Sequence, residues 1–170
     1  MPTILETPRL ALRTMSLDDL DVIASMLEHP EVMRFWPRTL SRAEAVEWVE
    51  RQIGRYATKG YGFWLALDRT SGTPVGQVGL IAKELDSVDE VEIGYMIHRP
   101  FWRNGYASEA AVGCREYAFT THSRPRVLCL IRPANTPSIG VARKIGLKTH
   151  GRIISHFGSD HILFTGERPL

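Results

Sequence analysis

The stretch from Tyr95 to Ala110, YMIHRPFWRNGYASEA, constrains the fold of this chain more than any other. Its first residues end an apolar segment typical of a strand, and its last residues begin a helical pattern of small side chains. We therefore expect a strand to pass through a loop with proline and glycine directly into a helix. The start of a helix offers backbone N–H groups without intrahelical partners, and its dipole attracts negative charge. The junction thus predicts a site for a phosphate or pyrophosphate.

The junction taken alone leaves a second interpretation open. Gly105 would equally suit an ordinary helix start, and Arg103 would then be a solvated surface residue. The loop has a single glycine, so it lacks the G-x-G-x-x-G pattern of dinucleotide sites, and it also lacks the GK[ST] of a Walker A loop. The rest of the chain has to decide between the two interpretations.

The remaining segments predict one α/β domain over residues 1–170 with a mixed, mostly antiparallel sheet. Apolar alternation or continuous apolar runs predict seven strands, over residues 9–14, 62–68, 75–82, 91–97, 126–132, 148–156 and 160–166. Helical spacing predicts four helices, over about 17–28, 41–56, 105–120 and 136–145. The resulting order, β-α-α-β-β-β-α-β-α-β-β, places one strand–helix–strand unit between an antiparallel meander and a terminal hairpin.

Three local patterns make finer predictions. Ser41 and Glu44 form a capping-box pattern for the second helix, whose apolar stripe we expect to run through Val49 and Ile53 with Trp48 to its side. Thr136 is the expected N-cap of the last helix. The polar segment 83–89 is expected to be a loop between two strands.

Composition excludes several classes of protein. The net charge is +2, from 21 Lys and Arg against 19 Asp and Glu, which does not favour a nucleic-acid binder with a basic stripe. Two isolated cysteines and the absence of H-E-x-x-H or C-x-x-C patterns favour a cytoplasmic chain without disulfides or a metal. The N-terminus lacks a signal-peptide pattern, and no apolar run is long enough to span a membrane.

Several of these segments resemble the GNAT-type N-acetyltransferase superfamily. EIGYMIHRPFWRNGYASEA is similar to its motif A, [QR]-x-x-G-x-[GA], and NTPSIGVARKIGL resembles the asparagine-containing helix that follows in that superfamily. ETPRLALRTMSLDDLD, EVMRFWP and DHILF resemble the RimJ/RimL-like branch, whose members acetylate the N-termini of ribosomal proteins. The likeness covers nearly the whole chain in order, and Trp102 departs from the first position of motif A.

The resemblance implies a place for acetyl-CoA, the expected cosubstrate. Its pantetheine arm would lie in a gap between the fourth and fifth predicted strands, against the backbone of Tyr95, Met96 and Ile97. The amides that would hold its pyrophosphate belong to consecutive residues of the loop and helix start: Arg103, Asn104, Gly105, Tyr106, Ala107 and Ser108. Asn135 and Lys144 (or its neighbour Arg143) would add contacts, although a solvated helix end explains Lys144 equally well.

Acetyl transfer to an amine needs a base to keep the amine neutral and a donor to the tetrahedral oxyanion. Glu92 is the candidate base, against the alternative of a solvated strand residue or one that only forms a salt bridge. The superfamily's usual acid, a tyrosine seven residues after the helix asparagine, is Ala142 here. Ser138 is its candidate substitute, against the alternative of an ordinary first-turn serine.

The expected function is direct transfer of an acetyl group from acetyl-CoA to a primary amine, either a peptide N-terminus or a small molecule. Phe35, Trp36 and Phe63 are the candidates for lining the acceptor site, against the alternative of ordinary core or surface packing. The competing hypothesis is a CoA-binding sensor module without catalysis, which the missing tyrosine favours. A homodimer is compatible with the resemblance, and neither a membrane nor a nucleic acid is expected as a partner.

Overall fold

The computed structural model describes residues 1–169, which form one eight-stranded sheet with four α-helices. The strands are β1 Thr3–Glu6, β2 Leu10–Arg13, β3 Phe63–Asp68, β4 Pro74–Leu85, β5 Val88–Ile97, β6 Arg126–Ile131, β7 Lys148–His156 and β8 Ser159–Glu167. The helices are α1 Leu20–Leu27, α2 Arg42–Lys59, α3 Tyr106–Thr120 and α4 Thr136–Lys144. The sheet order is β1-β2-β3-β4-β5-β6-β8-β7, and every neighbouring pair is antiparallel except β5 and β6.

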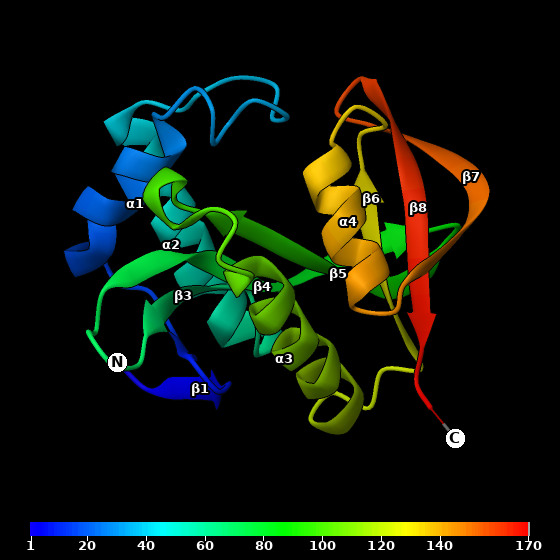
Figure 1. Ribbon diagram of the computed structural model, residues 1–170, viewed down its shortest axis with the longest axis horizontal. Helices are drawn as coiled ribbons and strands as arrows, with labels where there is room; N and C mark the ends of the chain where they lie inside the picture. Colours follow the sequence, from blue (N-terminus) through cyan, green and yellow to red (C-terminus); the bar gives the residue numbers. More distant parts are fainter. Residues whose placement is uncertain (170) are drawn as a thin grey trace.

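Helices cover both faces of the sheet (Figure 1). On one face, α3 and α4 pack on a large apolar cluster that includes Trp64, Val78 and Phe164. On the other face, α1 and α2 pack on a second cluster around Phe63 and Leu65. The predicted α/β domain with a mixed, mostly antiparallel sheet is therefore confirmed. Strand β1 was missed because it is a short, partly exposed edge strand without clear alternation.

The segment 83–89, predicted as a loop, is in fact the end of a long hairpin. Strands β4 and β5 pair from Gly76↔Ile97 to Leu85↔Val88. Asp86 and Ser87 both have positive φ, 53° and 63°, which is the backbone of a two-residue type I′ turn. The polar composition of the segment hid the strand, because these residues extend beyond the helices that cover the rest of the sheet.

Helix α2 buries a different face from the one predicted. Its capping box is confirmed, since the Ser41 side chain accepts from the Glu44 N–H. Its buried residues are Ala45, Trp48, Val49 and Gln52, whereas Ile53 is 41% exposed. Trp48 is drawn inward because its indole N–H donates to the Gln77 side chain at 2.9 Å, a bond between two buried groups.

Strands β5 and β6 separate soon after they meet. Their register within residues 1–169 consists of the single pair Glu92↔Leu128. Beyond it, β5 remains paired with β4, and β6 remains paired with β8. The predicted splay is therefore present, and it opens toward the C-terminal end of β5, where the loop and α3 follow.

Candidate active site between the splayed strands

Side chains replace the sheet hydrogen bonds where β5 and β6 diverge. The Leu130 N–H, which would face β5 in a continuous sheet, donates to Glu92 Oε1 at 3.3 Å. The Cys129 Sγ lies 3.3 Å from the Ile93 carbonyl. Glu92 is thus held at the apex of the gap by the backbone of the opposite strand.

Past the apex, alternate residues of β5 direct their backbone toward the gap. The His98 N–H donates to the Val75 carbonyl of β4, so the residues that bond to β4 are the even-numbered ones. Tyr95 and Ile97 therefore direct their N–H and C=O groups to the side that β6 has left. The Ile97 carbonyl is already occupied, because the Trp102 indole N–H donates to it at 2.6 Å. Met96, by the same alternation, directs its backbone to β4.

The loop after β5 ends in a backbone conformation that suits a bound anion. Gly105 is the N-cap of α3 with φ 78°, and Arg103 also has positive φ, 64°. A Cβ at Gly105 would meet only the Arg9 guanidinium, at 3.5 Å, so the space over the glycine is otherwise open. The first N–H groups of α3 have no intrahelical partners and face outward with the positive end of the helix dipole.

Arg9, which the sequence did not single out, braces this loop from the other end of the chain. Its guanidinium donates to the Asn104 carbonyl at 3.0 Å and pairs with Glu109 of α3 at 2.6 Å. It also lies 4.7 Å from the centroid of the Tyr106 ring. Arg9 thus fixes the loop to the first turn of α3, while its charge stays next to Gly105.

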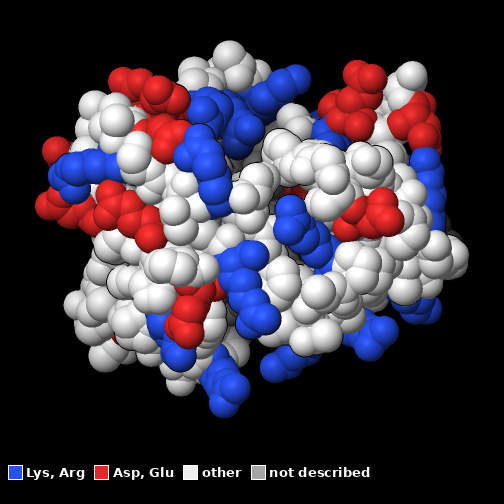
Figure 2. Space-filling model, turned by 90° about the horizontal axis from the view of Figure 1, so that it is seen from above, with Lys and Arg blue, Asp and Glu red and all other residues white. Residues whose placement is uncertain are grey.

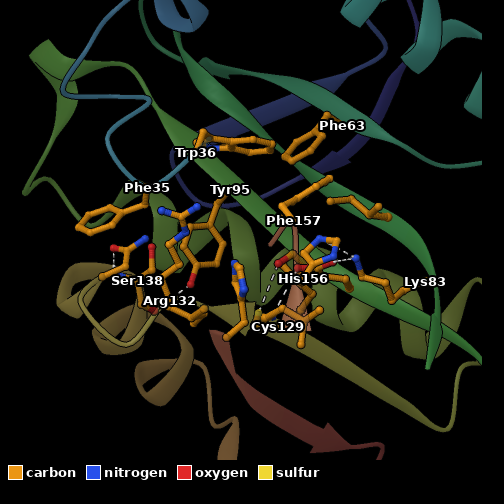
Figure 3. A pocket seen from close by; sticks show the side chains of 18 of the residues that line it. Phe35, Trp36, Phe63, Lys83, Tyr95, Cys129, Arg132, Ser138, His156 and Phe157 are labelled. Carbon is orange, nitrogen blue, oxygen red and sulfur yellow. Dashed lines mark hydrogen bonds and ion pairs between the residues drawn. The ribbon is translucent and has the colours of Figure 1, made fainter. Parts of the chain in front are cut away.

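Two cavities meet at the gap. One, the loop-side cavity, has a volume of about 540 Å³. It extends along the backbone of β5 to the loop and to the first turn of α3, and Glu31 and Ser108 are among its lining residues. The other, the Glu92 cavity of about 500 Å³, lies at the apex (Figure 3). The two cavities share five lining residues, namely Phe35, Trp36, Tyr95, Asn135 and Ser138. Two ligands could therefore approach one point from opposite directions.

Burial raises the pKa of Glu92 above its usual value of 4.5, and the nearby Lys83 charge opposes that rise. The Glu92 side chain is 13% exposed and lies 3.3 Å from Lys83 Nζ. Lys83 is in turn 3.1 Å from His156 Nε2, and burial followed by the Lys83 charge lowers the pKa of His156 to about 4. Neutral His156 therefore accepts from the Lys83 ammonium, and Glu92 is the one carboxyl group that lines the cavity among the described residues.

The first turn of α4 presents Asn135 and Ser138 to the point where the cavities meet. Asn135, rather than the predicted Thr136, is the N-cap, because its side chain accepts from the Ser138 N–H at 3.3 Å. The Tyr95 hydroxyl donates to the Ser138 carbonyl at 2.8 Å and so ties β5 to α4 across the gap. Among the hydrogen bonds of residues 1–169, none involves the Ser138 hydroxyl, which leaves it available to a ligand.

The structure brings most of the sequence-predicted residues to the two cavities. Of the predicted residues, Glu92 and Phe63 line the Glu92 cavity, and Gly105 and its neighbours Arg103, Tyr106, Ala107 and Ser108 line the loop-side cavity. Asn104 lies in the loop but donates its side-chain amide to the Phe101 carbonyl at 3.2 Å. Lys144 is exposed in the last turn of α4 and lines neither cavity, so its contact with a nucleotide remains a prediction.

Sequence reasoning missed several residues of the Glu92 cavity, namely Arg51, Arg55, Lys83, Arg132 and His156. They come from one helix, two strands and the residue that follows a third strand, which are far apart in the chain, so no spacing in the sequence connects them. In residues 1–169 no group of three His, Cys, Asp or Glu residues is placed to hold a metal ion. No helix within the same range is long and apolar enough to cross a membrane.

Comparison with known proteins decides the family. Residues 9–148 match the model of the acetyltransferase (GNAT) domain. The chain belongs to the GNAT acetyltransferase family. A GNAT acetyltransferase fold with a splayed β5 and β6 is thus confirmed, and the protein is an N-acetyltransferase, as several of its relatives are named.

Individual relatives of this GNAT protein agree along its length. The Bacillus subtilis (strain 168) protein named YkkB is 36% identical over 148 residues, which cover 85% of each chain. An acetyltransferase from Agrobacterium tumefaciens str. C58 has the same fold, with a TM-score of 0.85 and 23% identity over 99% of this chain and 95% of its own. RimL, a ribosomal L7/L12 alpha-N-protein acetyltransferase solved in complex with coenzyme A, gives a TM-score of 0.80 at 17% identity over 98% of each chain.

Proposed function

We propose that this GNAT protein transfers an acetyl group directly from acetyl-CoA to a primary amine within a ternary complex. The observation that carries the proposal is the meeting of two cavities at Tyr95, Asn135 and Ser138. One cavity follows an unpaired strand edge to an anion site, and the other contains a buried carboxylate. RimL, which shares the fold, was solved with coenzyme A, and this supports the assignment of the loop-side cavity to acetyl-CoA.

The residues of the loop-side cavity fit an acyl-CoA. The open space over Gly105 and the free N–H groups at the start of α3 suit a pyrophosphate. The N–H and C=O of Tyr95 and the N–H of Ile97 suit the amides of a pantetheine arm, which would then pair with β5 as an added strand. When bound, acetyl-CoA supplies the thioester that the amine attacks.

Glu92 is proposed to accept the proton of the incoming amine. Its raised pKa brings it closer to the pKa of an ammonium group than an exposed carboxylate would be, which favours proton transfer near neutral pH. The Ser138 hydroxyl is the proposed proton donor to the leaving thiolate.

Release of free thiol from acetyl-CoA in the presence of a panel of amines tests this function. We expect thiol release that requires both the protein and an amine, together with an acetylated amine detected by mass spectrometry. Binding of CoA without thiol release from any amine would instead establish the alternative, a CoA-binding sensor module. Thermal melting with CoA and with ATP provides the binding control, and stabilisation is expected with CoA alone.

A further inference from the structure

Basic side chains dominate the charged groups of the Glu92 cavity. Four of its lining residues carry a permanent positive charge, namely Arg51, Arg55, Lys83 and Arg132, and Glu92 is the one Asp or Glu among those that the structure describes. Lys83 is already paired with Glu92 at 3.3 Å. The cavity therefore has three guanidinium groups, those of Arg51, Arg55 and Arg132, whose charge no carboxylate of the cavity neutralises.

None of these three guanidinium groups has a carboxylate partner within residues 1–169. Other arginines of the protein are commonly paired, for example Arg13 with Asp19 and Arg126 with Glu90. Arg132 also has a buried Nε without any hydrogen-bond partner in the part of the chain that is described. An unpaired guanidinium that is partly removed from water is costly, so its retention points to a ligand that pairs with it.

The charges also act on one another. Arg51 and Arg55 lie one turn apart on α2, and burial together with the Arg51 charge lowers the pKa of Arg55. Arg55 makes one side-chain bond, to Gln52 Oε1 at 3.2 Å, which leaves most of its five donors available. Arg132 follows β6 on the other side of the gap. In the space-filling view, Lys and Arg side chains surround the hollow of this face, and acidic side chains lie mostly toward its outline (Figure 2).

Aromatic side chains form much of the remaining wall. Phe35, Trp36, Phe63 and Phe157 surround the cavity, with Arg132 beside Tyr95 and Ser138 (Figure 3). A cavity of about 500 Å³ suits a small molecule rather than a folded partner. The acceptor must also bring its amine to Glu92 in the same space.

We propose that the acceptor is a small amine that carries a carboxylate, such as a free amino acid with an apolar or aromatic side chain. The guanidinium groups of Arg55 and Arg132 bind the carboxylate, because a planar fork of N–H donors matches its two oxygens. The aromatic wall receives the side chain, and the amine faces Glu92. A polycationic amine is excluded from this cavity by the unpaired positive charges. This inference rests on the proposed acetyl transfer and specifies its substrate class.

Matched acceptors test the carboxylate directly. L-phenylalanine, L-phenylalaninamide and phenethylamine share a side chain and an amine, and only the first has a carboxylate. We expect kcat/KM for thiol release to be at least about 10-fold higher with L-phenylalanine than with either of the others, the range for one lost charged contact. The comparison is stringent, since the amine of the amide is the more readily deprotonated one and would react faster without recognition of the carboxylate.

Single substitutions then locate the recognition. Arg55→Gln and Arg132→Gln should each lower the preference for L-phenylalanine over its amide, measured as the ratio of the two kcat/KM values, about 10-fold. Lys59→Gln is the matched control, because it removes one exposed positive charge from the same helix outside the cavity and should leave the preference unchanged.

Binding gives a second readout that needs no turnover. N-acetyl-L-phenylalanine should raise the Tm of the free protein, whereas N-acetyl-L-phenylalaninamide should not, and Arg55→Gln should abolish the difference. Equal rates with acid and amide, together with equal effects on Tm, would overturn the carboxylate inference and leave the acetyltransferase function standing. An amide or a dipeptide as the better acceptor would overturn it in favour of a peptide N-terminus. A rise in Tm with N-acetyl-L-phenylalanine alone, without thiol release from any amine, would support the carboxylate-binding site and overturn the proposed acetyl transfer.

Discussion

Gly105 is the single residue on which the proposed anion site most depends. It combines a left-handed φ of 78° with open space on the ligand side. Gly105→Ala adds a Cβ in ordinary van der Waals contact with the Arg9 guanidinium, and the strained φ should cost about 1–2 kcal/mol of unfolding free energy. Gly105→Glu adds the same strain, and it also places a negative charge where the pyrophosphate is proposed to bind.

We therefore expect Gly105→Glu to abolish CoA binding, and Gly105→Ala to weaken it by less than about 10-fold, since strain acts mainly on stability. Isothermal titration calorimetry with CoA provides the measurement, and circular dichroism confirms that both variants are folded. Equal CoA affinity in the Glu variant and the wild type would remove the loop from the site.

The raised pKa of Glu92 leads to a prediction of how activity depends on pH. Because burial raises its pKa, the carboxylate takes up a proton at a higher pH than an ordinary glutamate, and activity should fall as the pH drops through that raised pKa. In Glu92→Gln the amine has to arrive already neutral. The loss of kcat/KM should therefore be larger at pH 6.5 than at pH 9, about 100-fold at the lower pH.

The control for this charge is Glu84→Gln, an exposed carboxylate on the same hairpin that is not paired with a basic residue within the described chain. It should leave the pH profile unchanged. A profile of Glu92→Gln that runs parallel to that of the wild type would assign the proton transfer to another group or to water.

Among the elements, α4 shows how a local rule from the sequence can miss the functional residue. The pattern Thr136-Pro137 suits a helix start, yet Asn135 provides the cap and presents its side chain to both cavities. Asn135→Ala should lower the free energy of unfolding by about 1 kcal/mol, whereas Thr136→Ala should change it by less than half of that. Chemical denaturation of the two variants measures the difference, and a larger loss for Thr136→Ala would restore the sequence-based prediction.

The elements themselves were largely predictable. Alternation and helical spacing gave β2 to β8 and the four helices in the correct order, because each pattern reflects burial against one sheet. The predicted buried face of α2 was wrong because the partner of Trp48 lies far away in the chain, and Trp48 turns inward to reach Gln77. The prediction of a loop at the end of the β4–β5 hairpin was wrong for a related reason, since the polar residues of that end extend beyond the helices.

The site was predictable to a different extent on its two sides. The loop around Gly105 is contiguous, so its residue spacing predicted the junction of β5, loop and α3 that the structure has, and its binding of a pyrophosphate is a proposal. The Glu92 cavity gathers Arg55, Lys83, Arg132 and His156 from separate elements, and only the fold brings them together. The bracing contact of Arg9 with Asn104 and Glu109 spans about 100 residues and leaves no local signal.

At the scale of the whole molecule, the sheet consists of two parts that share one residue pair. Strands β1 to β5 form one part and β6 to β8 the other, with α3, α4 and the Tyr95–Ser138 hydrogen bond as further connections. If CoA pairs with β5, the N–H groups of Tyr95 and Ile97 gain partners. We expect saturating CoA to slow hydrogen exchange at these two amides by at least about 10-fold.

The amide of Leu130 is the internal control for this measurement, because it already donates to Glu92. Its exchange should change much less than that of Tyr95 and Ile97. Uniform slowing over the whole sheet would indicate global stabilisation in place of a strand added in the gap.

Because β5 and β6 share a single residue pair, the proposed cosubstrate would also contribute to holding the sheet together. A ligand that joins the strand edge at Tyr95 would act as a removable ninth strand between two parts of the sheet whose strands pair at Glu92↔Leu128 alone among the described residues. Each turnover would then withdraw and replace a piece of the sheet. The cohesion of this protein would consequently follow the supply of CoA around it, so that depletion of CoA loosens the molecule as well as stopping its chemistry.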